Sequence, residues 1–187
     1  HKPKANMGKS KHLSDQDLIN KCIAQDSESQ KFMYEKFADK MYAVCLRYAT
    51  DRDHAKDLLQ DGFIRVFKSL PKYQYKGSFE GWVRRIFVNS SIEDYRKNKK
   101  GKFFEELSQA TEKQVNPTVL HDLNMQELLG LINELPIGYK TVFNMYVIDG
   151  FSHKEISEEL NVSESTSKTQ LRKARLALME KIENLEK

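Results

Sequence analysis

Basic and hydroxyl side chains recur at helical spacing after Ser163, near the C-terminus. Leu171, Ala174 and Leu178 share one face of the expected helix, and this face must be the core. The opposite face offers hydroxyl, guanidinium and ammonium groups to base edges, and long side chains at its margins can reach phosphates. An ordinary solvated, charged surface is the alternative. The predicted DNA contacts are Thr166, Lys168, Thr169, Arg172, Lys173 and Arg175.

Two capping signals place this helix in a larger motif. Ser152 followed by Glu155 forms a capping box, which predicts that a helix begins there. Asn161 and Val162 form a short turn before Ser163, which caps the second helix. Two short helices joined by such a turn form a helix-turn-helix, whose second helix enters the major groove of a duplex. This arrangement favours DNA binding over a merely solvated surface.

Aromatic and basic residues also gather in the N-terminal half, in the loop 71–78 and in the helix expected over 79–100. Rings stack on unpaired bases while cations follow the backbone, so this combination is typical of proteins that hold unpaired nucleotides. Trp82 and Phe87 fit core packing better, whereas Phe79 fits either role. The basic run 97–102 has a solvated helix end as its alternative interpretation.

The elements that position these residues are all predicted to be helices. Neither glycine nor proline occurs from Lys9 to Asp61, and apolar residues recur at helical spacing through most of the chain, with no alternating strand pattern. The sequence predicts an all-α protein of two small helical domains joined by a flexible linker. We expect a disordered tail or cloning remnant at 1–12, domains at 13–100 and 122–187, a linker at 101–121, and a natural start at Met7.

Composition and motifs exclude several classes of protein. The chain is 39% hydrophobic and 31% charged, typical of a globular protein, and holds no apolar run of the roughly 20 residues that membrane insertion needs. The two cysteines, Cys22 and Cys45, match neither a disulfide framework nor a metal site, which indicates a reducing cytoplasm. The five histidines are scattered, and His153 is expected on the surface. No enzyme activity, cofactor or metal is predicted.

The segments DLLQDGFIRVF (57–67) and FEGWVRRIFVN (79–89) resemble the first conserved domain, region 2, of bacterial sigma factors. The segment from Leu135 to Arg175 resembles the last conserved domain, region 4. Their direct joining resembles the extracytoplasmic-function (ECF) group of the sigma-70 family. The resemblance covers Leu13 to Ile182, and the ordered pair of motifs is highly specific.

The resemblance implies a cytoplasmic alternative sigma factor that binds the clamp and flap of core RNA polymerase and directs promoter recognition and opening. It further implies an anti-sigma factor as partner. Lys168, Thr169, Arg172 and Lys173 would read the −35 element as duplex. The contacts implied for the polymerase are Asp57, Gln60, Asp61, Arg65 and Phe67. Those implied for the melted −10 element are Tyr75, Lys76, Phe79, Arg84, Arg85, Asn89 and Arg96.

Three serines depart from the family pattern: Ser157 replaces an alanine, Ser165 a glycine and Ser167 a branched apolar residue. These departures bear on the preferred DNA sequence rather than on the role of the helix. The competing hypothesis is a conventional dimeric helix-turn-helix regulator with an N-terminal sensory domain, which would bind palindromic half-sites. A helical adaptor protein is a third hypothesis, but it leaves the basic C-terminal face without a use.

Overall fold

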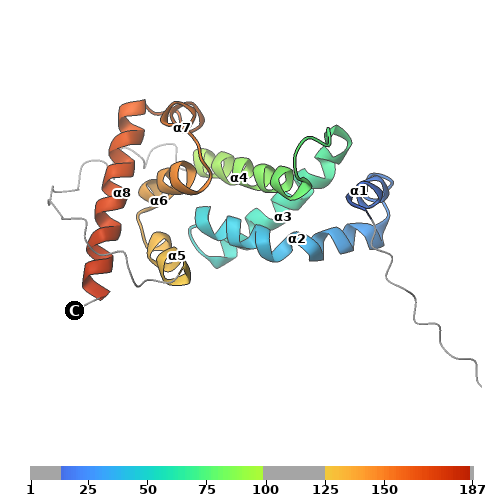
Figure 1. Ribbon diagram of the computed structural model, residues 1–187, viewed down its shortest axis with the longest axis horizontal. Coiled ribbons are helices and arrows are strands. Elements are labelled where there is room, and N and C mark those ends of the chain that lie inside the picture. The colour runs from blue at the N-terminus through green and yellow to red at the C-terminus, as the bar shows by residue number, and fades with distance from the viewer. Residues whose placement is uncertain (1–13, 99–124, 186–187) are drawn as a thin grey trace, which may run out of the picture.

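The computed structural model describes residues 14–98 and 125–185, and every regular element in these two ranges is a helix (Figure 1). This confirms the predicted all-helical architecture for the part of the chain that is described. The predicted tail 1–12 and linker 101–121 lie outside the described residues. No described helix is both long enough and apolar enough to cross a membrane.

The N-terminal unit consists of α1 (Asp15–Ile23), α2 (Ser27–Tyr48), α3 (Arg52–Ser69), the short 3-10 helix η1 (Leu70–Lys72) and α4 (Phe79–Asn98). Side chains cap all four α-helices of this unit. The hydroxyls of Ser14 and Ser78 accept from the amides of Asp17 and Gly81 at the starts of α1 and α4. The carboxylates of Asp26 and Asp51 accept from the amides of Ser29 and His54 at the starts of α2 and α3. Each cap satisfies an amide that a helix start leaves unpaired, so these boundaries are encoded locally.

Helices α2, α3 and α4 pack against one another around a buried apolar core. Gly62 allows α3 and α4 to approach closely, because the Phe87 ring lies directly over its Cα. An ideal Cβ at position 62 would lie 2.1 Å from Phe87 Cε1. Phe63 contacts the same ring edge-on at 5.2 Å between centroids. This tight pair fixes the orientation of α4 and therefore of its basic residues.

The C-terminal unit consists of α5 (Met125–Asn133), α6 (Ile137–Phe143), the π-helix η3 (Asn144–Ile148), α7 (His153–Leu160) and α8 (Glu164–Leu185). Helix α8 packs on α5, α6 and α7. Its Leu171, Ala174 and Leu178 are buried, which confirms the predicted core face.

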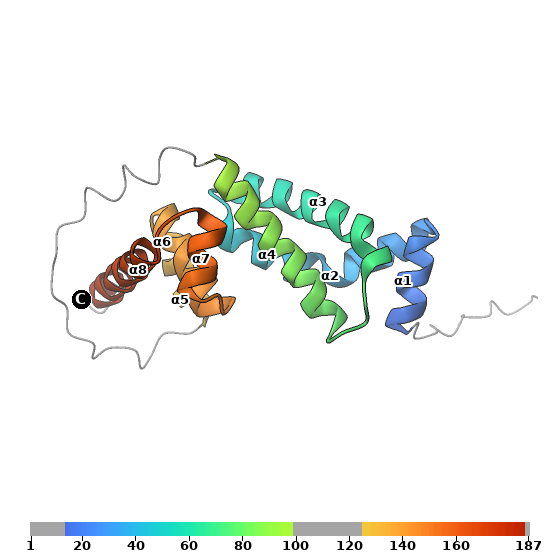
Figure 2. The ribbon, with the colours of Figure 1, turned by 90° about the horizontal axis from the view of Figure 1, so that it is seen from above.

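The two units lie against each other in the structure. Helix α2 contacts α5 and α6, and α4 contacts α7. Figures 1 and 2 show α6 and α7 between α4 and α8, so that α8 lies on the outer side of the molecule. The contact between the units therefore involves α7, the first helix of the predicted helix-turn-helix.

Candidate nucleic-acid interface

The helix-turn-helix is built by the caps that the sequence predicts. Ser152 accepts from the Glu155 amide at 3.2 Å, and the Glu155 carboxylate accepts from the Ser152 amide at 2.8 Å. The Ser152 amide and hydroxyl both donate to the Glu155 carboxylate, and these two bonds lower the pKa of that carboxyl below its usual range. Asn161 then takes a left-handed conformation with φ 55°, which ends α7. Ser163 accepts from the Thr166 amide at 3.0 Å and so caps α8.

The predicted −35 contacts share one side of α8. Lys168, Arg172 and Arg175 are exposed, while Thr166, Thr169 and Lys173 are half-buried. Lys168 lies 4.0 Å from the Glu164 carboxylate, a weak surface pair that leaves its ammonium group accessible. The Thr166 hydroxyl lies 2.9 Å from the Ser163 hydroxyl, so part of its bonding capacity serves the cap.

The prediction that His153 lies on the surface is correct only in part, because the residue is partly exposed. Its ring is half-buried and stacks on Tyr146 at 4.4 Å between centroids. Its Nδ1 lies 2.9 Å from the hydroxyl of Ser167, which is fully buried. Burial lowers the pKa of His153, and the nearby charge of Lys168 acts in the same direction. Ser167, one of the three serines that depart from the family pattern, therefore contacts His153 and links α8 to α7.

Five of the predicted −10 contacts lie on α4, and all of them except Phe79 are exposed. Arg84 and Arg85 line a cleft of about 350 Å³, which is completed by the C-terminal unit. The guanidinium of Arg96 donates across the units to the Glu159 carbonyl at 3.5 Å. Asn89 follows on the same helix and is exposed as well.

The loop before α4 forms an aromatic cluster beside a second cleft of about 320 Å³. Tyr75 is 49% exposed, has a left-handed backbone with φ 55°, and packs on Tyr73 at 4.8 Å. Lys76 is exposed beside it. Phe79 is only 5% exposed and stacks on Trp82 at 5.7 Å. The sequence left the role of Phe79 open, and the structure assigns its ring to the core, with one side lining the cleft.

The predicted polymerase contacts divide between an exposed face of α3 and its margins. Asp57, Gln60 and Asp61 are exposed. Arg65 donates to the Glu93 carboxylate of α4, and this bond with that from Lys97 lowers the pKa of Glu93 to about 2. The half-buried Phe67 packs near Phe63 at 6.2 Å between centroids.

Two exposed apolar side chains lie near these residues and were not predicted. Ile64 of α3 is 49% exposed, and Tyr34 of α2 is 41% exposed and contacts Phe63 at 4.6 Å between centroids. Exposed apolar side chains among charges are typical of protein-binding surfaces. The helical spacing of Ile64 with Asp57 and Asp61 is the signal that could have placed it on this face.

The contact between the units rests on residues that the sequence analysis did not single out. Arg47 and Asp149 form an ion pair with N–O distances of 3.0 and 3.1 Å, and their side chains are only 8% and 6% exposed. Tyr48 donates to the same carboxylate. Asn144 donates to the Arg47 carbonyl at 2.8 Å, and Lys140 to the Ala49 carbonyl at 2.7 Å.

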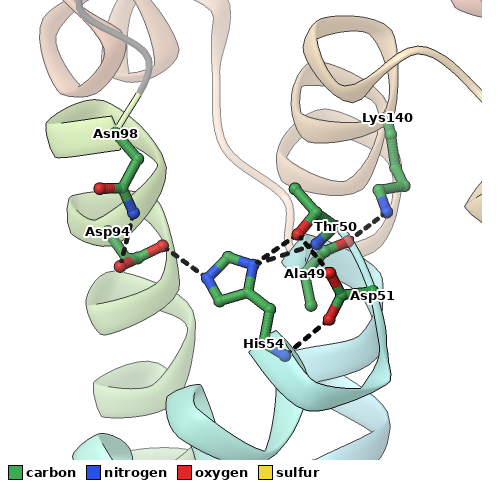
Figure 3. Close-up of polar contacts among 7 residues, drawn as sticks. All are labelled: Ala49, Thr50, Asp51, His54, Asp94, Asn98 and Lys140. Carbon is green, nitrogen blue, oxygen red and sulfur yellow. Dashed lines mark hydrogen bonds and ion pairs between the residues drawn. The ribbon is translucent and has the colours of Figure 1, made fainter.

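Figure 3 shows how Lys140 of α6 reaches the turn between α2 and α3. In the same turn, His54 Nδ1 accepts from the Thr50 amide at 3.1 Å, and Nε2 lies 2.8 Å from the Asp94 carboxylate of α4. Because Nδ1 accepts a backbone hydrogen, Nε2 carries the proton that Asp94 accepts. His54 thus fixes the surface on which the C-terminal unit lies.

Among the described residues, no group of three histidine, cysteine, aspartate or glutamate side chains could hold a metal ion. Both cysteines are buried and free. Burial raises the pKa of Cys22 to about 11 and that of Cys45 to about 12, so neither is an activated thiol.

Comparison with known proteins identifies both units. Residues 33–101 match the family model for sigma-70 region 2, and residues 125–178 match that for sigma-70 region 4. The chain is 29% identical to the ECF RNA polymerase sigma factor SigW of Bacillus subtilis over 184 residues, which cover 90% of this chain and 98% of SigW. It is 28% identical to the ECF RNA polymerase sigma factor SigE of Mycolicibacterium smegmatis over 151 residues, covering 78% of this chain and 58% of SigE.

A solved structure of the sigma factor RpoE of Bartonella quintana, in complex with the anti-sigma factor NepR, shares 18% sequence identity. The match covers 80% of this chain and 94% of that chain, with a TM-score of 0.46. The two family models match in the order region 2, region 4, and together with the curated relatives they show that this chain belongs to the ECF group of the sigma-70 family of bacterial RNA polymerase sigma factors.

Proposed function

We propose that the chain is an alternative sigma factor, which binds core RNA polymerase and directs promoter recognition and opening. The observation that carries this proposal is the pairing of two different nucleic-acid surfaces on one chain. Helix α8 presents a basic face behind a capped turn, and α4 presents a basic face beside an aromatic cleft. The first suits a duplex and the second suits unpaired bases.

For the −35 element, we propose that α8 enters the major groove with Thr169, Arg172 and Lys173 toward base edges. Lys168 and Arg175, at the margins of this face, would contact phosphates. Thr166, in the first turn of α8, would lie at the N-terminal end of the same face. Arginine can donate two hydrogen bonds to guanine, which gives base discrimination, whereas a phosphate contact gives affinity without discrimination.

For the melted −10 element, we propose that Arg84, Arg85, Asn89 and Arg96 hold the strand, with Tyr75 and Lys76 at its edge. The cleft of about 320 Å³ beside Tyr75 is near the lower limit of ordinary small-ligand sites, which suits one unstacked base. Phe79 would contribute as a wall of this cleft, not as a free stacking platform. Holding a base outside the duplex favours the melted state by differential binding.

For polymerase, we propose that Asp57, Gln60 and Asp61 contact the clamp, supported by Arg65 and Phe67 at the margins of the face. The exposed Ile64 supplies an apolar centre to this acidic surface. Region 4 would contact the flap. An anti-sigma factor that covers both DNA-binding units is a further expected partner, supported by family membership. The two proposed partners, polymerase and promoter DNA, imply a cytoplasmic location.

The test is to mix the chain with core polymerase and to measure promoter-directed transcription from a genomic fragment library. We expect assembly of a holoenzyme with one copy of the chain, and initiation at asymmetric sites. Asp57→Arg with Asp61→Arg should abolish assembly, while the matched variant Asp39→Arg, on the exposed surface of α2, should not. Polymerase-independent dimers on palindromic sites would instead favour a conventional regulator.

A further inference from the structure

We propose that His153 is a positioning residue for the recognition of the −35 element. Through its hydrogen bond to Ser167, it fixes the first two turns of α8 and thereby the base specificity of the helix-turn-helix. This inference rests on the proposed function, because it takes α8 as the helix that reads a duplex. It adds to the proposed DNA contacts a residue that acts through another side chain rather than on the DNA itself.

The buried face of α8 changes from polar to apolar along the helix. Its first two buried residues are the polar Ser167 and Gln170. The later buried residues are apolar: Leu171, Ala174, Leu178 and Ile182. Burial of apolar area therefore holds the helix from Leu171 onward and contributes little before it. Three of the proposed −35 contacts lie in the polar part: Thr166, Lys168 and Thr169.

The other polar groups of these turns do not connect them to a neighbouring helix. Gln170 is 1% exposed, and its side-chain oxygen has no hydrogen-bond partner within the part of the chain that the structure describes. A buried polar atom without a partner costs free energy instead of contributing it. The cap bond from the Thr166 amide to Ser163 lies within the first turn. The bond between Ser167 and His153, by contrast, joins this part of α8 to α7.

The direction of this bond follows from the state of the ring. Burial lowers the pKa of His153, and the charges of Lys168 and Arg175 act in the same direction. Glu164 acts in the opposite direction without reversing the shift. The ring is therefore neutral at neutral pH, with one donor and one acceptor nitrogen. The Ser167 hydroxyl is fully buried and lies 2.9 Å from Nδ1, so Nδ1 accepts its proton and Nε2 carries the ring hydrogen.

His153 is itself held from two sides, which allows it to position a neighbour. Its ring stacks on Tyr146 of η3, at 4.4 Å between centroids and 22° between planes. Its backbone is the first residue of α7, directly after Ser152, whose capping box with Glu155 fixes the chain there. The bond to Ser167 transmits this position to α8. Three elements therefore share one arrangement at the end of α8 that would enter the groove.

The position of these turns affects base contacts more than phosphate contacts. A hydrogen bond to a base edge requires a donor–acceptor distance within a range of about 0.5 Å and a nearly linear angle. Attraction between a basic side chain and a phosphate falls off gradually with distance, and a long side chain can adjust to a small displacement. Loss of the bond between His153 and Ser167 should therefore reduce discrimination between −35 sequences more than affinity for duplex DNA in general.

Three variants separate the hydrogen bond from the other contacts of the ring. Ser167→Ala and His153→Phe remove the bond from its two ends, and phenylalanine keeps a ring that can stack on Tyr146. His153→Asn does the reverse, because its amide oxygen can take the place of Nδ1 while the ring is lost. A helical serine without its partner can donate to the carbonyl four residues back, so the variants should fold. The matched control is Ser157→Ala, which removes a hydroxyl that donates to the Lys154 carbonyl at 2.7 Å within α7.

Discrimination is the ratio of holoenzyme binding to −35 duplexes that the wild type selects from a random library and to unselected duplexes. We expect this ratio to fall by about 5-fold or more in Ser167→Ala and in His153→Phe, and no further in the double variant. His153→Asn and Ser157→Ala should stay near wild type. Equal weakening on selected and unselected duplexes would make His153 a phosphate contact and overturn the proposal. Retention of the ratio in His153→Phe with loss in His153→Asn would overturn it too, because the ring stack would then position α8.

Amide hydrogen exchange of the polymerase-free full chain is the second readout, and it does not depend on the sigma function. Protection of amides 167–171 should fall by about 5-fold or more in Ser167→Ala and His153→Phe, while amides 178–182 keep theirs. Unchanged protection of the first two turns in both variants would overturn the proposal. If protection falls as expected but the wild-type chain forms no holoenzyme, the proposed function is refuted and the positioning of α8 by His153 is confirmed.

Discussion

Replacing Gly62 by alanine should destabilise the N-terminal unit, although alanine is the better helix former. The added Cβ would lie 2.1, 2.4 and 2.6 Å from three carbons of the Phe87 ring, where ordinary contacts are about 3.5–4.0 Å. The ring cannot withdraw easily, because it is fully buried and Phe63 packs edge-on against it. Overpacking of this kind costs about 1–3 kcal/mol, and the clash here favours the upper end.

The gain in helix propensity offsets about 1 kcal/mol of this cost, which leaves a net loss of about 1–2 kcal/mol. For a unit of this size, the melting temperature should fall by about 5–15 °C. Trp82 is the single tryptophan of the chain and lies in α4, so its fluorescence follows the melting of the N-terminal unit. Phe87→Leu in the same chain should recover part of the loss, because a smaller side chain relieves the clash.

Gly130→Ala is the matched control, because a Cβ at this position of α5 meets nothing within 4 Å. This variant should be stabilised by about 0.5–1 kcal/mol through helix propensity alone. If Gly62→Ala melted at or above the wild-type temperature, the close approach of α3 and α4 described here would be wrong, and with it the orientation assigned to the basic face of α4.

Three other predictions concern the site and its supports. Arg172→Ala should lower discrimination among −35 sequences by about 1–3 kcal/mol, measured by competition binding of the holoenzyme; equal weakening on every sequence would make Arg172 a phosphate contact. Glu93, whose pKa is lowered to about 2 by Arg65 and Lys97, contributes stability that is complete above about pH 4.5 and is lost as pH falls toward 2. Acid titration of Trp82 fluorescence should show this loss, and Glu93→Gln should remove that component. Ser152→Ala should cost about 1 kcal/mol by loss of the capping box, seen as a lower melting temperature in circular dichroism; an unchanged melt would contradict the role of this cap.

The elements of this fold were largely predictable, because their boundaries are encoded over a few residues. Ser152 and Ser163 each accept a hydrogen bond from the amide three positions on, as their spacing predicts. The core face of α8 followed from helical periodicity. Such signals depend on neighbours in the sequence, so they can be interpreted without knowledge of tertiary structure. The assignments of individual residues to DNA and polymerase remain predictions.

Contacts between distant segments could not be predicted in this way. Arg47 and Asp149 are 102 positions apart, and neither carries a local signal that it is buried. His153 looked like a surface residue, because nothing nearby in the sequence indicates its contacts with Tyr146 and Ser167. Phe79 was ambiguous for the same reason, since a core ring and a stacking platform are identical in sequence. Only packing distinguishes them.

The π-helix η3 (Asn144–Ile148) sets the rotational phase of everything that follows it. Its widened turn, in which the Asp149 amide donates to the Asn144 carbonyl five residues back, accommodates one residue more than an α-helical turn. Since each helical residue adds about 100° of rotation, deleting one residue here would restore an α-helix and turn Asp149 away from Arg47. A deletion of one residue in this turn would therefore break the ion pair between Arg47 and Asp149 without changing any residue of α8.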